Sequence, residues 1–185
     1  MKSSLLIVLF VLIGIPSLLA QPYQQGQLTI SPGVVLGNLG LYSGGSGIPL
    51  MASAEYGLHE YFGVGPFVGV ARYSYNYIGS RYRWNFVNFG GRGDFHYLPL
   101  LEELLEKDLP TEKLDLYLAA MLGFRIANFS SNDGFTGGIN TFGNGVFLST
   151  AVGARYYFTD NIAVFGELGY ILFGVLNAGV TIKIK

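Results

Sequence analysis

Apolar and polar residues alternate with a repeat of two along most of the chain from residue 27 onward. This repeat predicts β-strands that have one apolar and one polar face. In the stretch KLDLYLAAMLGFRIANF, Asp115 and Arg125 are ten residues apart and therefore share a face of a strand. Leu116, Leu122 and Phe124 lie on the opposite face. Turn-forming residues divide the chain into eight predicted strands, over residues 27–37, 49–59, 64–76, 82–97, 114–128, 145–158, 162–171 and 175–185.

The predicted strands are long, and their connections alternate in length. Most strands span about 10 to 15 residues, against a usual ~5–6, and a tilted strand that crosses a bilayer needs about 9–11. Long or polar connections follow the first, third and fifth strands, at residues 38–48, 77–82 and 129–145. Short turns follow the second and sixth strands, near residues 59–62 and 159–161. This alternation is typical of a membrane barrel with both chain ends in the periplasm.

The connection LPLLEELLEKDLPTEK, over residues 98–113, departs from this alternation. Pro99 opens the segment, Pro110 closes it, and Leu101 and Leu105 recur at helical spacing. We predict a short amphipathic helix on the periplasmic side. A helix that caps or plugs the barrel end is favoured over one that binds a partner.

The charged face of the strands is sparse, with one or two charges per strand among Gly, Ala and Ser. A soluble barrel places its apolar face inside, whereas a transmembrane barrel places it outside. A sparse charged face suits the narrow interior of eight strands, where opposite charges can pair. We therefore predict an all-β fold, an eight-stranded antiparallel up-and-down transmembrane β-barrel with a short periplasmic-side helix. Its lumen charge network would comprise Glu55, Arg72, Arg92, Asp94, Asp115, Arg125, Arg155, Glu167 and Lys183.

Aromatic residues occur near the ends of the apolar faces. Such positions suit the girdles where an amphipathic ring meets the lipid headgroups. The predicted girdle residues are Tyr73, Tyr75, Tyr97, Tyr156, Phe158 and Tyr170.

Composition agrees with a lipid environment. Half of the chain is hydrophobic and only 12% is charged, whereas soluble domains typically carry about 25% charged residues. The formal net charge of −1 gives no electrostatic reason to expect a nucleic acid or an anionic membrane surface as partner. Because the sequence has no Cys, it excludes disulfides, thiolate metal sites and a cysteine-linked lipid anchor.

The first twenty residues have the features of a secretory signal peptide. Lys2 supplies a positive charge, residues 5–15 form an apolar core, and Pro16 and Ala20 precede the expected cleavage point. The core is shorter than the ~20 residues of a membrane-spanning helix. We expect residues 1–20 to be removed on export and residues 21–185 to form the barrel domain; an uncleaved anchor or a buried helix is less favoured.

The two histidines, His59 and His96, fall near the periplasmic ends of inward faces. A metal site would need a third ligand such as Glu60 or Asp94, and hydrogen-bonded interior histidines are favoured over it. A lipid hydrolase would need a Ser-His-acid set at the outer rim, where neither histidine lies. We therefore expect no catalytic residues, no cofactor and no bound metal. Structural salt bridges are favoured over an ion pathway, because an eight-stranded interior is usually packed shut.

The stretches GGRGDFHYLPLL and KLDLYLAAMLGFRI, with the terminal LNAGVTIKIK, resemble the small outer-membrane β-barrel domain of Bacteroidetes, an eight-stranded barrel of the OmpA/OmpX type. In that domain a Gly-Arg-Gly-x-x-His strand is followed by a Leu-Asp-Leu-Tyr strand. The resemblance covers about residues 23–185. It implies outer-membrane localisation, with the barrel assembly machinery as a partner. Many such barrels end in an aromatic residue, whereas this sequence ends at Lys185.

Together these features favour an exported, integral outer-membrane barrel with a structural, adhesive or envelope-interaction role and no enzymatic activity. Contacts would be made by the outer loops, outer-membrane lipid would surround the barrel, and nucleic acid is not expected. An extracellular or periplasmic protein partner stays unspecified. Two alternatives remain open: a narrow, porin-like channel, and a secreted soluble lipid-binding barrel whose cavity is lined by Leu116, Leu122 and Phe124.

Overall fold

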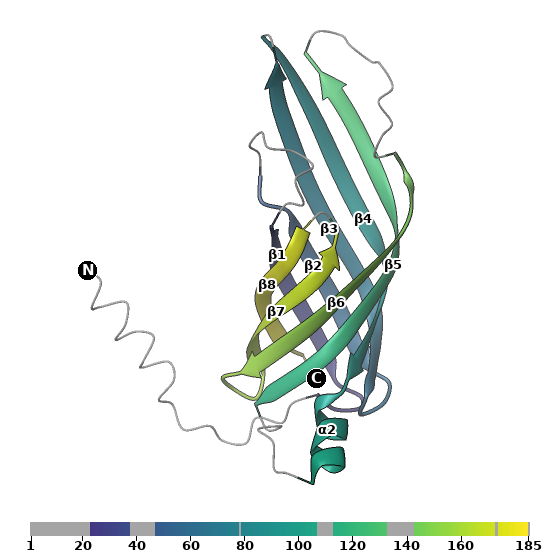
Figure 1. Ribbon diagram of the computed structural model, residues 1–185, viewed down its shortest axis with the longest axis vertical. Coiled ribbons are helices and arrows are strands. Elements are labelled where there is room, and N and C mark those ends of the chain that lie inside the picture. Colours follow the sequence, from purple (N-terminus) through teal and green to yellow (C-terminus); the bar gives the residue numbers. More distant parts are fainter. Residues whose placement is uncertain are drawn as a thin grey trace, which may run out of the picture.

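The chain forms a closed antiparallel β-barrel with one helix below its lower end (Figure 1). The computed structural model describes residues 23–37, 47–77, 79–106, 113–132, 143–172 and 174–184. Strands that follow one another in sequence pair with one another, and β1 pairs with β8 to close the sheet. The described strands are β1 (Leu28–Leu36), β2 (Leu50–Gly57), β3 (Phe62–Tyr77), β4 (Ser80–His96), β5 (Leu114–Ser131), β6 (Gly145–Tyr157), β7 (Ile162–Ile171) and β8 (Gly174–Lys183).

The predicted fold class is confirmed, and each predicted strand overlaps an observed one in the same order. Three connections lie at the lower end, together with the two ends of the barrel (Figure 1). The predicted signal peptide, residues 1–20, lies outside the described residues.

Side chains alternate between the exterior and the lumen. Along β5, Leu118 and Leu122 are 49% and 62% exposed, whereas Ala119 and Met121 are buried. The same alternation places buried polar side chains such as Glu55 in the lumen and leaves leucine, valine and isoleucine on the outside. This polarity is the reverse of a water-soluble barrel and is the one required when lipid surrounds the strands.

The upper part of the lumen is filled by an apolar cluster. Leu172, in the turn from β7 to β8, has a positive φ of 54° and a completely buried side chain. A positive φ is unfavourable for leucine, and the burial of its side chain offsets that cost. Gly69 leaves the room it needs, because a Cβ there would stand 2.4 Å from Leu172 Cδ1. The cluster includes Val35, Met51, Phe67, Phe86, Met121, Ile171 and Leu172.

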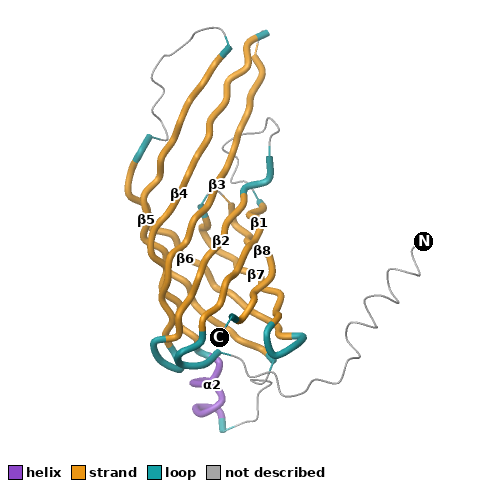
Figure 2. Tube along the Cα trace, turned by 180° about the vertical axis from the view of Figure 1, so that it is seen from behind, coloured by secondary structure: helices purple, strands orange, loops and turns teal. Residues whose placement is uncertain are grey.

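Strands β3, β4 and β5 continue upward beyond their neighbours (Figures 1 and 2). They contain 16, 17 and 18 residues, whereas β2 contains 8. Pairing with β2 ends at Val70 and pairing with β6 ends at Arg125, while β3 and β4 stay paired up to Tyr77 and Ser80. We call the part above this level the extension; it comprises residues 71–77, 80–86 and 127–132.

The extension replaces part of two predicted loops. Residue 77 belongs to β3, residues 80–81 to β4 and residues 129–131 to β5, so the predictions of loops at 77–82 and 129–145 were wrong for these residues. Their polar and aromatic composition resembles a loop, yet they pair with one another as strands. A tight turn with Gly79 at φ 80° joins β3 to β4. Residues 38–46 and 133–142 of the predicted loops lie outside the described residues.

The two faces of the sheet exchange character in the extension. Arg72 is exposed on the outer face, and Tyr73 is only 6% exposed on the inner face. The predictions of an inward Arg72 and an outward girdle Tyr73 were therefore wrong. Both assumed that the outer face stays apolar along the whole strand, whereas above the apolar exterior polar side chains take that face.

The other predicted girdle positions divide by burial. Tyr156 and Tyr170 are 43% and 46% exposed on the outer face. Tyr97 and Phe158 are half-buried just beyond the ends of their strands. The side chain of Tyr75 lies outside the described residues.

The predicted helix is present as α2 (Leu98–Leu105) at the lower end. Pro99 lies in its first turn, where its missing N–H has no intrahelical partner to lose. Leu98 is buried against the barrel, whereas Leu104 and Leu105 are 76% and 52% exposed. The helix lies below the lower end of the strands and does not enter the lumen (Figure 2), so it does not plug the barrel. No helical segment in the described part of the chain has the length and apolar character needed to cross a membrane.

Candidate functional site

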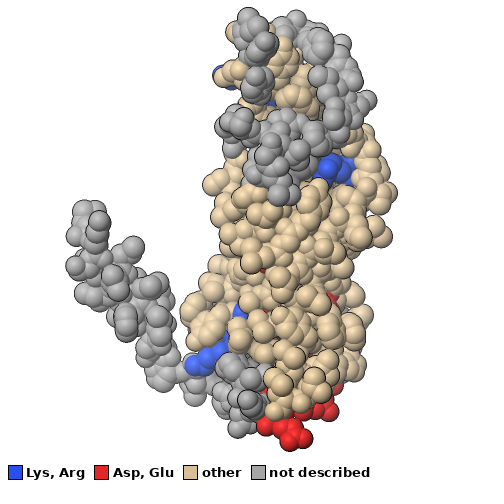
Figure 3. Space-filling view, viewed as in Figure 1, with Lys and Arg blue, Asp and Glu red and all other residues tan. Residues whose placement is uncertain are grey.

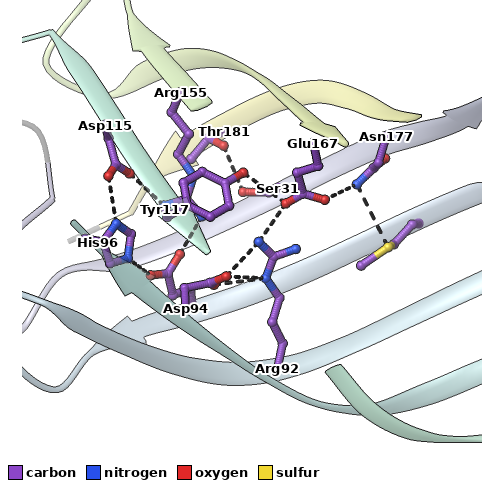
Figure 4. Close-up of polar contacts among 12 residues, drawn as sticks. Ser31, Arg92, Asp94, His96, Asp115, Tyr117, Arg155, Glu167, Asn177 and Thr181 are labelled. Carbon is purple, nitrogen blue, oxygen red and sulfur yellow. Dashed lines mark hydrogen bonds and ion pairs between the residues drawn. The ribbon is translucent and has the colours of Figure 1, made fainter. Parts of the chain in front are cut away.

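Charged side chains gather in the lower part of the lumen, and Figure 4 shows how they lie. They come from five different strands, so the group connects nearly the whole circumference of the barrel. None is more than 4% exposed. The charged members of this lumen charge network are Glu55, Arg92, Asp94, His96, Asp115, Arg155 and Glu167.

Four of these side chains form a closed ring of alternating donors and acceptors. Arg155 donates from Nη2 to Glu55 Oε2 at 2.6 Å and from Nη1 to Asp115 Oδ2 at 3.3 Å. His96 places Nδ1 2.7 Å from Asp115 Oδ1 and Nε2 2.7 Å from Glu55 Oε1. Because both ring nitrogens face carboxylate oxygens, the geometry fits an imidazolium that donates twice. The ring links β2, β4, β5 and β6.

Arg92 organises the second half of the network. Its Nε donates to both oxygens of Asp94, at 3.0 and 2.9 Å, and its Nη2 reaches Glu167 Oε1 at 2.6 Å. Glu167 also accepts hydrogen bonds from the Tyr117 hydroxyl at 2.9 Å and from Asn177 Nδ2 at 2.8 Å. Both oxygens of each of these carboxylates are therefore engaged by donors.

Tyr117 lies between the two halves. Its ring faces the Arg155 guanidinium at 4.3 Å and the Arg92 guanidinium at 5.6 Å, so it contributes cation–π contacts as well as its hydroxyl. Gly153 on β6 makes this position possible, because a Cβ there would stand 2.3 Å from the ring carbon Cζ. The strand pairing of Tyr117 with Gly153 places the ring across the lumen.

The lower end of the network is covered by Tyr23, which precedes β1. Its ring stacks on His96 with a centroid separation of 3.5 Å and an interplanar angle of 11°. Gly57 and Gly63 leave space for it, since a Cβ on either would fall within 3.1 Å of the Tyr23 hydroxyl oxygen. Burial raises the pKa of the Tyr23 phenol well above its ordinary value, and nearby carboxylates act in the same direction. A neutral ring therefore separates the network from the lower opening.

The structure brings six of the nine predicted network residues together. Arg125 lies higher in the lumen, where its Nε donates to Asn88 Oδ1 at 3.0 Å and its guanidinium faces Phe147 at 5.3 Å. Lys183 lies at the lower end with its Nζ 4.3 Å from the centroid of the Tyr157 ring. Arg72 belongs to the outer face of the extension, as described above.

Sequence reasoning did not assign Tyr117, Asn177 or Tyr23 to the network. Tyr117 is two residues from Asp115 on the same strand face, which was a usable signal. Asn177 likewise shares the polar face of its strand with Thr181. No pattern marks Tyr23, because its place depends on how the chain enters the barrel.

The two histidines occupy different environments. His96 is the buried, hydrogen-bonded residue expected, whereas His59 is exposed in the turn between β2 and β3 and contacts the Tyr61 backbone N–H. Glu60 is exposed in the same turn and Asp94 is held by Arg92. Among the described residues, no three potential ligands of this kind lie close enough to hold a metal ion. The network consists of opposite charges in mutual contact across five strands.

No protein-family model and no curated protein matches the chain. Among solved structures, a de novo designed transmembrane β-barrel is similar at 18% identity, covering 88% of this chain and 97% of that one, with a TM-score of 0.48. The N-terminal β-barrel domain of Pseudomonas aeruginosa OprF is similar at 17% identity, covering 87% of this chain and 98% of that one, with a TM-score of 0.45. Ail, the attachment invasion locus protein of Yersinia pestis, in complex with the heparin analogue sucrose octasulfate, is similar at 13% identity, covering 85% of this chain and 93% of that one, with a TM-score of 0.45. This likeness is distant and says nothing about a ligand; the narrower resemblance to Bacteroidetes barrels stays a prediction.

Glu55→Gln tests whether the network holds the barrel together. The amide keeps the size of the side chain but removes the charge that faces both Arg155 and His96. Removing one partner of a buried ion pair costs about 3–5 kcal/mol. Because Arg155 and His96 each keep Asp115 as a partner, we expect a loss at the lower end of that range, about 3 kcal/mol, in the free energy of unfolding, measured by urea titration in lipid vesicles. Glu60→Gln, in the exposed turn, is the matched control and is expected to stay within about 0.5 kcal/mol of the parent. Equal stability of the two variants would contradict a structural role for the network.

Proposed function

We propose that the protein is an integral barrel of the bacterial outer membrane that does not conduct and that holds the extension above the outer leaflet for adhesive or envelope contacts. The observation that carries this proposal is a lumen in which the described side chains are buried at successive levels, below an extension of three strands. Function on such a scaffold belongs to the exposed outer parts.

The filling of the lumen argues against a channel. Tyr23 covers the lower end, the charge network fills the next layer, and the apolar cluster around Leu172 fills the upper layer. The arginines that could line an ion pathway, Arg92 and Arg155, are each held by two carboxylates. An eight-stranded barrel has an interior just wide enough for such side chains.

The direction of the outer side chains argues against a soluble lipid carrier. That alternative requires Leu122 and Phe124 to line a cavity, yet they are 62% and 39% exposed on the outside. Leu116 shares this face and is half-buried. The apolar exterior of β3 from Phe62 to Val70 is about nine residues long, which suits a tilted strand crossing lipid at ~9–11 residues.

The placement of the ends supports an orientation. The barrel begins and ends at the lower end, beside the turns at residues 58–61 and 158–161. Barrels of the outer membrane have short turns on the periplasmic side and longer outer parts. The predicted signal peptide supplies the export that this orientation needs. The extension then projects from the cell.

Single-cysteine labelling tests the location and the orientation. The sequence contains no Cys, so Ser130→Cys on the extension and Asp160→Cys in a lower turn provide clean reporters, both at exposed positions. We expect a membrane-impermeant maleimide to label Ser130→Cys in intact cells and Asp160→Cys only after the envelope is opened. The reverse pattern, or equal labelling in intact cells, would contradict the proposed placement.

Planar-bilayer recording tests the closed lumen. We expect purified protein to give no conductance steps under conditions in which a general porin conducts, because buried side chains occupy the described interior at successive levels. Steps whose size changes in Arg92→Gln or Glu167→Gln would show that ions pass the network, and would favour the channel alternative.

A further inference from the structure

The exterior changes from apolar to polar at one level on three strands. Val70, Val87 and Ile126 are 45%, 37% and 36% exposed and are neighbours across β3, β4 and β5. Two residues higher on each strand, the outer face carries Arg72, Asn85 and Asn128, which are also neighbours. Because all three strands change together, this level marks where lipid tails give way to headgroups.

The arginines above this level lack acidic partners within the described residues. By strand parity Arg81 and Arg83 share the outer face with Arg72. The structure pairs none of the three with a carboxylate in the described part of the chain, and the described residues of the extension include no Asp or Glu. This contrasts with Arg92 and Arg155 of the lumen, each of which contacts two carboxylates.

The exposed negative charge lies at the other end of the molecule. In Figure 3 acidic atoms gather at the lower end, and the residues described there as exposed acids are Glu60, Glu103, Glu106 and Asp160. Although the formal net charge is only −1, exposed acidic residues lie at the lower end and exposed arginines lie on the extension. A near-zero net charge gives no reason to expect an anionic partner, whereas the local charge of the extension does.

A hollow opens beside Arg72 where β2 begins. It has a volume of about 390 Å³ and lies across the level at which the exterior changes. Its lower wall is apolar, formed by Ile48, Leu50, Val70 and Val87, and its upper wall carries Arg72 and Asn85. Asn85 Oδ1 accepts a hydrogen bond from Arg72 Nε at 2.8 Å, which fixes the plane of the guanidinium. Within the described residues, the two terminal amino groups of Arg72 have no hydrogen-bond partner.

We propose that this Arg72 hollow binds a phosphorylated glycolipid of the outer leaflet. A planar guanidinium suits a phosphate group, to which it can donate two parallel hydrogen bonds. The amide of Asn85 stands beside it to meet a sugar hydroxyl, and one acyl chain lies along the apolar wall below. In the hollow the charged side chain lies above the apolar wall. A lipid in the outer leaflet likewise has its headgroup above its acyl chains. The proposal rests on the outer-membrane placement proposed above.

Lipid binding by the full chain tests this assignment. We would titrate the protein in detergent micelles with diphosphoryl lipid A and count bound lipid by native mass spectrometry. Arg72→Gln is expected to weaken binding about ten-fold, the size of a lost charge-assisted contact. Lys113→Gln, a basic residue beside the lower end of β5, is the matched control and should bind as the parent does. Dephosphorylated lipid A should bind the parent protein as weakly as lipid A binds Arg72→Gln.

Further measurements separate the possible failures. Arg72→Gln should keep the heat-dependent gel mobility of a folded barrel, so that lost binding is not lost folding. Equal binding by Arg72→Gln and the parent overturns the proposal, and so does full displacement of lipid A by an equal concentration of inorganic phosphate, which would indicate a site for a free anion. Surface labelling of Ser130→Cys without lipid A binding would leave the proposed function standing and remove the glycolipid site.

Discussion

A barrel surrounded by lipid must bring every charge within its walls into the lumen and neutralise it there. The ring formed by Glu55, Arg155, Asp115 and His96 meets this requirement, since each member contacts two of the others. An isolated charge in such an interior costs far more free energy than a paired one. Because the partners come from different strands, neutralisation can be complete only when the sheet is closed. Charge pairing and barrel closure therefore depend on each other.

The same requirement fills the described lumen with side chains, and in the proposed function it leaves the contacts to the surface. Bulky pairs such as Arg155 with Tyr117 occupy the space through which ions or ligands would pass. The exterior below Val70 is mostly apolar, while the outer face of the extension carries arginine and amide side chains. The chain thus separates a structural charge set, paired inside, from an exposed charge set that faces outward. Among the charges of these two sets, the exposed set is the one that solvent reaches.

Much of the fold could be predicted from the sequence because the solvent on each face is constant over most of each strand. The alternation between Asp115 and Leu116 was sufficient to place β5 and to orient it. The prediction failed for Arg72 and Tyr73 because the outer face changes along β3 and β4 from apolar to polar side chains. Parity alone cannot locate that change; the register across three strands does.

Most residues of the candidate site could be predicted from the sequence, but the contacts between them could not. Strand parity identified Glu55, Arg92 and Glu167 as inward, but which acid meets which base depends on strand stagger and on the width of the lumen. The stacking of Tyr23 on His96 depends on the path of a segment outside the sheet. Strand parity likewise could not predict the burial of Leu172, because this residue lies in a turn with a positive φ and not in a strand.

The most direct measurement of whether lipid faces the exterior is fluorescence quenching by brominated lipid. The sequence has one Trp, Trp84, so a variant with Trp84→Phe and Leu148→Trp reports on an outer position of β6 that is 65% exposed. Reconstituted into vesicles whose acyl chains carry bromine at their middle, this variant should lose much of its fluorescence relative to unbrominated vesicles. Unchanged fluorescence, or protein that stays in solution apart from the vesicles, would contradict a lipid-facing exterior.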